Sequence, residues 1–158
     1  MTSVLLVFAQ RADARVDIVG WNAHAERFFA TRLELAEEKR YAATSAAPSR
    51  DSARFVVTPA GGAAVVRSAW ARPTNAQDIL LAHSADARAG RTGLAGLAAR
   101  CRTVWGIERE IEPDLPSLRL AIVLASVLLG PICDPDAGVL LGVKSARAEL
   151  EAYERLGR

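Results

Sequence analysis

Residues 118–129 read Leu-Arg-Leu-Ala-Ile-Val-Leu-Ala-Ser-Val-Leu-Leu, and this stretch sets the centre of the molecule. As a helix it is apolar on nearly every side, and such a helix must be covered by other elements in several directions. Pro116 suits the first turn of a helix, and Gly130-Pro131 supplies an end. We therefore expect a central, buried helix over about residues 117–129.

The apolar run does not predict a membrane span. Between Leu120 and Leu129, where Ser126 is the one polar residue, it falls well short of the roughly 20 residues that cross a bilayer. The first residues, Met-Thr-Ser-Val-Leu-Leu-Val-Phe, lack the basic start and the cleavage site of a signal peptide.

Cys101 and Cys133 form no Cys-x-x-Cys pattern and indicate small core residues rather than a disulfide framework or a zinc site. We expect a cytoplasmic protein.

The beginning of the chain predicts a β-hairpin followed by a helix. The apolar run at 4–9 and the alternation of charged and apolar residues after it favour strands at 3–9 and 14–20. Over 23–41 the apolar residues take a helical spacing, which predicts an amphipathic helix lying on a sheet. Residues 42–52 have no periodicity and predict a mobile surface loop.

A second hairpin is expected at 54–58 and 64–70, because Pro59-Ala60-Gly61-Gly62 between them has the chemistry of a turn. Thr74 and Gln77 have the capping-box spacing and predict a helix that reaches about Arg88. The remaining expected elements are a short helix at 94–101, a strand at 103–110, a short edge strand at 139–143 and a last helix capped by Ser145.

Paired strands joined by short loops indicate a largely antiparallel sheet. The expected fold class is α+β: two β-hairpins plus one or two further strands, covered by helices on one face. A chain of 158 residues fits one domain, so we expect a single domain over 1–158.

Composition excludes some classes of function. Apolar residues are 51% and charged residues 24% of the chain, as in ordinary globular proteins. The net charge of +2 argues against a protein that binds nucleic acid through phosphate contacts. Arginine greatly outnumbers lysine, which occurs only as Lys39 and Lys144, and this bias indicates a GC-rich bacterial genome.

No catalytic or cofactor motif stands out in the sequence. The glycines at 90–96 lack the spacing of a phosphate-binding loop, so we expect neither a nucleotide nor another cofactor, and no metal. His24 and Glu108 are the candidates for a catalytic base and acid, although no partner group accompanies them in sequence.

The polar and aromatic residues at strand ends are the candidates for a binding site. Tryptophan and arginine are over-represented where proteins anchor their partners. If the strand ends share one rim of the sheet, six residues would gather there: Trp21, Asn22, Trp70, Arg72, Trp105 and Arg109.

These observations favour a small cytosolic binding protein without catalytic activity, such as an accessory, regulatory or toxin-neutralising immunity-type module. Its expected partner is another protein or a second copy of the chain in a homodimer, and not nucleic acid or a membrane. The alternative is a small enzyme that acts on an anionic metabolite at one end of the sheet. In that case His24 would be the base, and Arg72 or Arg109 would hold the anion.

Overall fold

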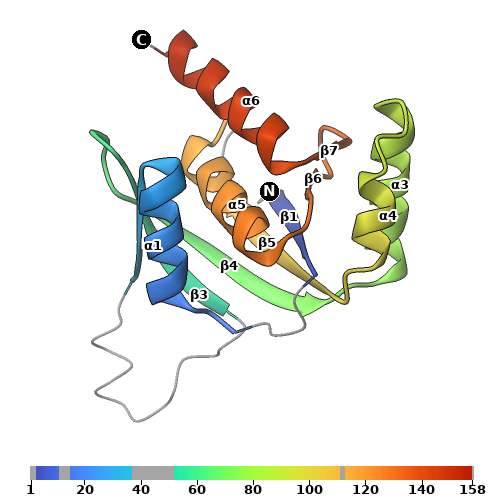
Figure 1. Cartoon of the computed structure of the whole chain (residues 1–158), viewed down its shortest axis with the longest axis horizontal. Coiled ribbons are helices and arrows are strands. Elements are labelled where there is room, and N and C mark those ends of the chain that lie inside the picture. The colour runs from blue at the N-terminus through green and yellow to red at the C-terminus, as the bar shows by residue number, and fades with distance from the viewer. Residues whose placement is uncertain (1–2, 11–14, 37–51, 111–112, 158) are drawn as a thin grey trace.

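The computed structural model describes residues 3–10, 15–36, 52–110 and 113–157. Its framework is a seven-stranded sheet with the order β2-β3-β4-β5-β1-β6-β7, in which all neighbouring strands are antiparallel (Figure 1). The predicted α+β class with a largely antiparallel sheet is confirmed. The strands are β1 (Ser3–Ala9), β2 (Thr31–Leu35), β3 (Ser52–Pro59), β4 (Val65–Pro73), β5 (Thr103–Arg109), β6 (Ile132–Asp134) and β7 (Val139–Leu141).

Helices cover both faces of this sheet, so the expectation that they cover one face is wrong. Side chains of β1 alternate between two cores, because successive residues of a strand point to opposite faces. The α5 core contains Leu5 and Val7 of β1, and the α3 core contains Leu6 and Phe8. On the α5 core lie α1 (Ile18–Phe29), α5 (Leu115–Leu128) and α6 (Val143–Leu156); on the α3 core lie α3 (Ala76–Arg88) and α4 (Leu94–Ala99).

Helix α5 is the predicted central helix, and its burial is confirmed, since most of its residues are inaccessible to solvent. Asp114 caps its first turn by accepting a hydrogen bond from the Ser117 N–H, and Leu129 ends it in the left-handed conformation. Gly130 then passes so close to β1 that a Cβ there would lie 1.7 Å from the Phe8 carbonyl oxygen. Among the described residues, no helix is long and apolar enough to cross a membrane.

The predicted second hairpin is present as β3 and β4, with the expected turn between them. The following helix starts one residue later than predicted. Asn75 and Asp78 form its capping box in place of Thr74 and Gln77. Strand β6 was not predicted; it pairs with β7, which lies at the edge of the sheet as expected.

The predicted first hairpin is wrong, and so is the long helix after it. Asp17 caps a helix rather than lying within the predicted strand at 14–20, because its Oδ1 accepts from the Gly20 N–H at 3.1 Å. Ala30 takes the left-handed conformation and ends α1, and the chain continues as β2. The predicted loop at 42–52 lies outside the described residues except for Ser52, the first residue of β3.

Helix α1 folds back along β2, the edge strand that follows it. The Asn22 Oδ1 accepts a hydrogen bond from the Leu33 N–H at 2.8 Å. Leu33 lies opposite Val57 of β3, but its N–H bonds to Asn22 and not to β3, so this N–H points away from the sheet. The Asn22 side chain therefore satisfies a backbone group at the sheet edge.

Candidate functional site

The three tryptophans do not share a rim. Trp21 and Trp105 are buried in the α5 core, with ring centroids 5.6 Å apart in an edge-to-face arrangement, and Trp21 also stacks on Phe55. Trp70 lies on the opposite face of the sheet, where its indole covers Gly106. The predicted cluster of tryptophans at one end of the sheet is therefore not formed.

The predicted polar residues are engaged within the fold. Arg72 donates to both carboxylate oxygens of Asp78, at 2.6 and 2.8 Å, and so joins β4 to the start of α3. Arg109 donates to both oxygens of Asp134 and to Asp136, and joins β5 to the β6–β7 turn. Like Asn22, these arginines connect neighbouring elements.

His24 and Glu108, the candidate base and acid, lie on opposite sides of the sheet. The His24 Nε2 is 2.7 Å from the Ser126 Oγ on α5, beside the α5 core. Burial lowers the pKa of His24, and the positive charge of Arg27 lowers it further. Glu108 follows Ile107, a residue of the α5 core, and so faces the other way; it accepts from the Ser68 N–H at 3.0 Å.

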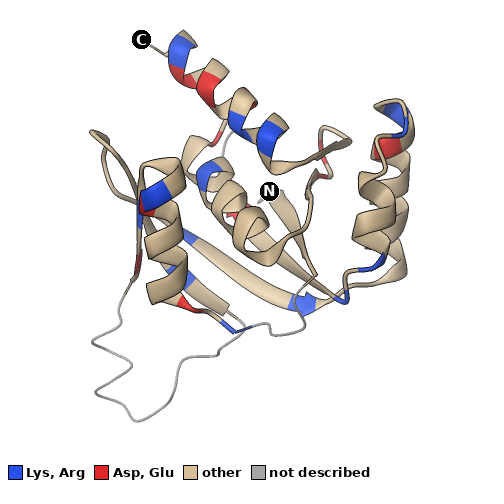
Figure 2. Ribbon diagram, viewed as in Figure 1, with Lys and Arg blue, Asp and Glu red and all other residues tan. Residues whose placement is uncertain are grey.

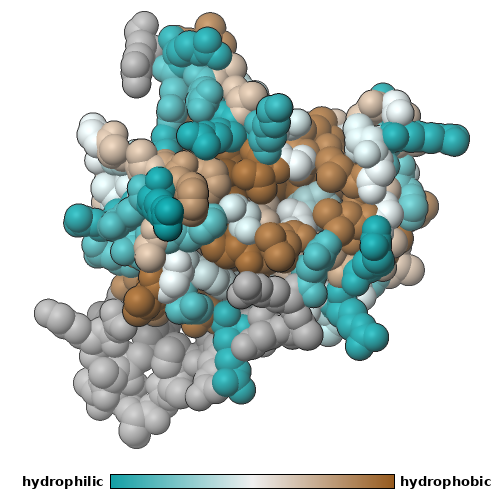
Figure 3. Space-filling view, in the orientation of Figure 1, coloured by the Kyte–Doolittle hydropathy of each residue, from teal (hydrophilic) through white to brown (hydrophobic). Residues whose placement is uncertain are grey.

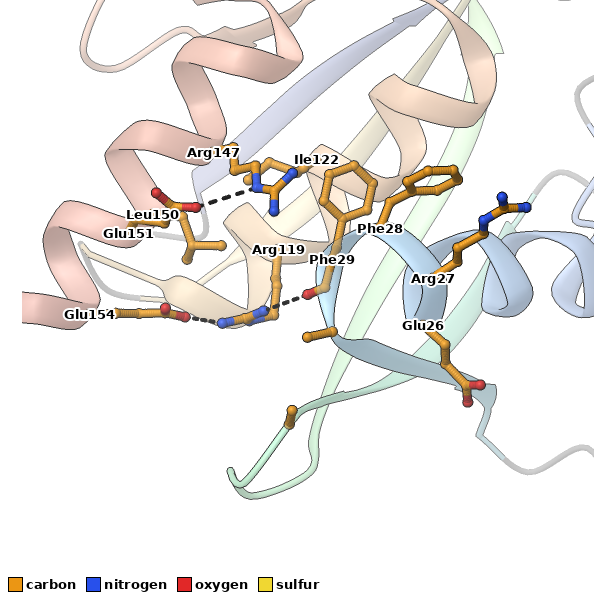
Figure 4. Close-up of a pocket in the computed structure, with 12 residues that line it drawn as sticks. Glu26, Arg27, Phe28, Phe29, Arg119, Ile122, Arg147, Leu150, Glu151 and Glu154 are labelled. Carbon is orange, nitrogen blue, oxygen red and sulfur yellow. Dashed lines mark hydrogen bonds and ion pairs between the residues drawn. The ribbon is translucent and has the colours of Figure 1, made fainter.

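A cleft of about 440 Å³ opens between α1 and α6, with α5 as its floor (Figure 4). We call it the α1–α6 cleft. Its volume falls within the range of about 300–1,000 Å³ that is usual for ligand sites. Three helices line it: α1 with Glu26, Arg27, Phe28 and Phe29, α5 with Arg119 and Ile122, and α6 with Arg147, Leu150, Glu151 and Glu154. Ala30, which follows α1, and Ala60, which follows β3, complete the lining.

The apolar part of the α1–α6 cleft comes from all three helices. Phe29, Ile122 and Leu150 belong to the α5 core or pack against it, and they reach the cleft from beneath. Phe28 is 46% exposed and stands at the border of the cleft. Hydrophilic side chains dominate the surface of α6 in the space-filling view, whereas hydrophobic ones gather over the middle of this face (Figure 3).

Charged residues of both signs line the α1–α6 cleft, and on α6 basic residues near the start of the helix are followed by acidic ones (Figure 2). Each lining carboxylate has an arginine partner: Glu154 pairs with Arg119, Glu151 with Arg147 and Glu26 with Arg32. Arg119 also donates to the Phe29 carbonyl and the Thr31 hydroxyl, so both of its Nη groups have partners within the fold.

Two lining arginines stack on the phenylalanines. The guanidinium carbon of Arg147 is 5.6 Å from the centroid of the Phe29 ring, and that of Arg27 is 5.1 Å from the Phe28 ring. Such stacking holds a guanidinium by its face and leaves its N–H edge available. Within the described part of the chain, Arg27 has no carboxylate partner.

A second cavity, of about 170 Å³, lies beside Arg109 and Tyr153. It is smaller than usual ligand sites. Asp114 and Asp134 line it, but each is already paired with a buried arginine. In the described residues no group of His, Cys, Asp or Glu side chains is arranged to hold a metal ion.

Comparison of the chain with protein-family models, curated proteins and solved structures finds no match.

The residues of the α1–α6 cleft were not singled out from the sequence. In the sequence, Phe28 and Phe29 have the pattern of core residues of one amphipathic helix. Arg147, Glu151 and Glu154 have the pattern of the solvent-exposed side of another. Nothing in the local pattern reveals that α1 and α6, which are far apart in the sequence, lie on either side of one cleft.

Proposed function

We propose that this chain is a binding protein and that the α1–α6 cleft receives its partner. The observation that carries the proposal is that one concavity is lined both by the exposed Phe28 and by Arg147, which stacks on Phe29. Aromatic and arginine side chains supply most of the binding energy in protein interfaces, particularly where a pocket shields them from water.

The proposed partner is another protein, or a second copy of the chain. In this proposal the protein serves as an accessory, regulatory or immunity-type module in the bacterial cytoplasm. The alternative, an enzyme with His24 as its base, draws support from the contact between His24 and Ser126. That support is weaker, because neither residue lines either of the two cavities described above.

A site-specific photo-crosslinker tests the proposal. Placed at position 28 and activated in the producing cells, it should give a discrete adduct. The matched control is position 80 on α3, because Leu80 is 60% exposed but faces away from the cleft. The captured protein, once purified, should bind wild type at least about tenfold more tightly than Phe28→Ser, since anchor side chains contribute that much or more.

Equal adducts at positions 28 and 80, or unchanged binding by Phe28→Ser, would show that the cleft is not the binding site. An adduct between two copies of the chain identifies the partner as a second copy, and sedimentation of wild type and Phe28→Ser would then measure the same loss of affinity.

A further inference from the structure

Arg147 lies at the opening of the α1–α6 cleft with part of its hydrogen-bonding capacity unused. Its Nε faces the Glu151 carboxylate at 3.3 Å, and its guanidinium rests on the Phe29 ring. Its two Nη groups make no hydrogen bond or ion pair with another residue that the structure describes. The side chain is 53% exposed, so these donors are accessible to a bound group.

The charges around the cleft favour an anion over a cation. All three lining carboxylates already have an arginine, whereas Arg27 has no carboxylate partner among the described residues. Arg119 is less suited to be the anion's donor, because its side chain is only 11% exposed and Glu154, Thr31 and the Phe29 carbonyl already accept from its Nη groups. An incoming carboxylate would therefore meet Arg147, whose Nη groups have no partner among the described residues.

The remainder of the cleft favours an apolar group next to that anion. Leu150 lies next to Arg147, and the exposed ring of Phe28 lies on the other side of Phe29 (Figure 4). Burying this carbon surface against an apolar group is favourable. The volume of about 440 Å³ suits one compact group rather than a whole helix. A carboxylate joined directly to an aromatic or branched side chain has both properties.

We propose that the occupant of the α1–α6 cleft is the C-terminal residue of a partner protein. Its α-carboxylate accepts from the Nη groups of Arg147, and its apolar side chain packs against Phe28 and Leu150. A chain terminus combines both groups in a single residue, and carboxylate capture is an established mode of peptide recognition. This inference rests on the proposed function and adds the chemistry of the bound group.

The test uses acetyl-Gly-Gly-Phe with a free carboxylate and the same peptide with a C-terminal amide, titrated into the purified protein by calorimetry. The acid should bind at least about tenfold more tightly than the amide, because a charge-assisted pair is lost in the amide. Arg147→Gln should abolish that preference. Glu151→Gln should strengthen binding of the acid by about threefold, since it removes a carboxylate that competes for Arg147.

Arg155→Gln is the matched control, because Arg155 is also an exposed arginine of α6 but does not line the cleft. It should leave both affinities unchanged, and the circular dichroism spectrum of every variant should match wild type. Equal binding of acid and amide, or an acid preference that survives Arg147→Gln, overturns the inference.

Two further outcomes separate this inference from the proposed function. If 4-phenylbutyrate binds as tightly as the peptide and depends equally on Arg147, the occupant is a free apolar acid and not a chain terminus. If position 28 captures a partner while acid and amide peptides bind alike, the cleft is a protein-binding site of different chemistry, and this inference alone fails.

Discussion

Single polar side chains hold the elements of this protein together. Asn22, Arg72 and Arg109 have the chemistry of ligand-binding residues, and the sequence singled them out for that reason. In the structure they bind the Leu33 N–H, Asp78 and Asp134 instead. Sequence alone could not separate the two roles, because a backbone amide or a carboxylate of the same chain is recognised by the same donors and acceptors as a ligand.

Asn22 offers a test at this scale. Asn22→Ala should lower the free energy of unfolding by about 1 kcal/mol, because the Leu33 N–H loses its acceptor. Urea denaturation measures the change. Glu26→Ala is the control, since it removes the other hydrogen-bond partner of Asn22, at 3.4 Å on an exposed surface, and should cost under about 0.5 kcal/mol. If the two substitutions lowered the free energy of unfolding equally, the hydrogen bond between Asn22 and the Leu33 N–H would not be a specific source of stability.

Among the elements, α5 is anchored by a buried ion pair at its start. Asp114 accepts from two nitrogens of Arg67 on β4, at 3.1 Å each, and from the N–H groups of Glu110 and Ser117. Both side chains of the ion pair are nearly inaccessible to solvent, at 8% and 1% exposed. Removing one partner would leave a buried charge without compensation.

Asp114→Asn should therefore destabilise the protein by about 3 kcal/mol at neutral pH. The exposed pair of Arg147 and Glu151 is the contrast: Glu151→Gln should cost under about 0.5 kcal/mol in the same urea experiment. If both variants lost a similar amount of stability, burial of the Arg67–Asp114 pair would not make it more important for stability than an exposed pair.

The acid dependence of stability tests the same carboxylate. Burial tends to raise the pKa of Asp114, but the hydrogen bonds from Arg67, Glu110 and Ser117 outweigh it and hold the pKa below the ordinary value of 3.8. The unfolded chain thus takes up this proton first as the pH falls. The stabilisation is complete well above pH 3.8 and disappears toward the folded pKa, so wild type should lose more stability on acidification than Asp114→Asn.

Sequence patterns predicted those elements whose local signal has one interpretation. Helix α5 and the β3–β4 hairpin combine a clear hydrophobic pattern with proline and glycine at their ends. Residues 15–35 have two interpretations, because apolar residues such as Leu33 and Leu35 fit the period of either a helix or a strand. Pairing of β2 with β3 selects the strand, and that partner is distant in the sequence.

In the whole molecule, β1 joins two cores that lie on opposite faces of the sheet. Its odd-numbered apolar side chains pack in the α5 core, and its even-numbered ones pack in the α3 core with Cys101 and Cys133. Burial, followed by the charges of Asp134 and Asp78, raises the pKa of Cys133 to about 11. Its thiol is therefore protonated at neutral pH and inert in the folded protein.

This arrangement predicts one cooperative unfolding transition. In a Trp70→Phe variant, which lacks the tryptophan on the other face of the sheet, the thiols report on the α3 core and the fluorescence of Trp21 and Trp105 on the α5 core. Both signals should have the same urea midpoint. The measurement combines tryptophan emission with the extent of reaction of Ellman's reagent at pH 8. Thiol reaction at a clearly lower urea concentration would show that the α3 core opens independently.

The covered edge of β2 has a consequence for how other molecules approach the protein. The outward Leu33 N–H is already bonded to Asn22, and β7 at the opposite edge is only three residues long. An extended peptide therefore meets an interrupted ladder of backbone groups at β2 and a very short one at β7, and both features disfavour growth of the sheet by strand addition. These edges therefore favour recognition through side chains.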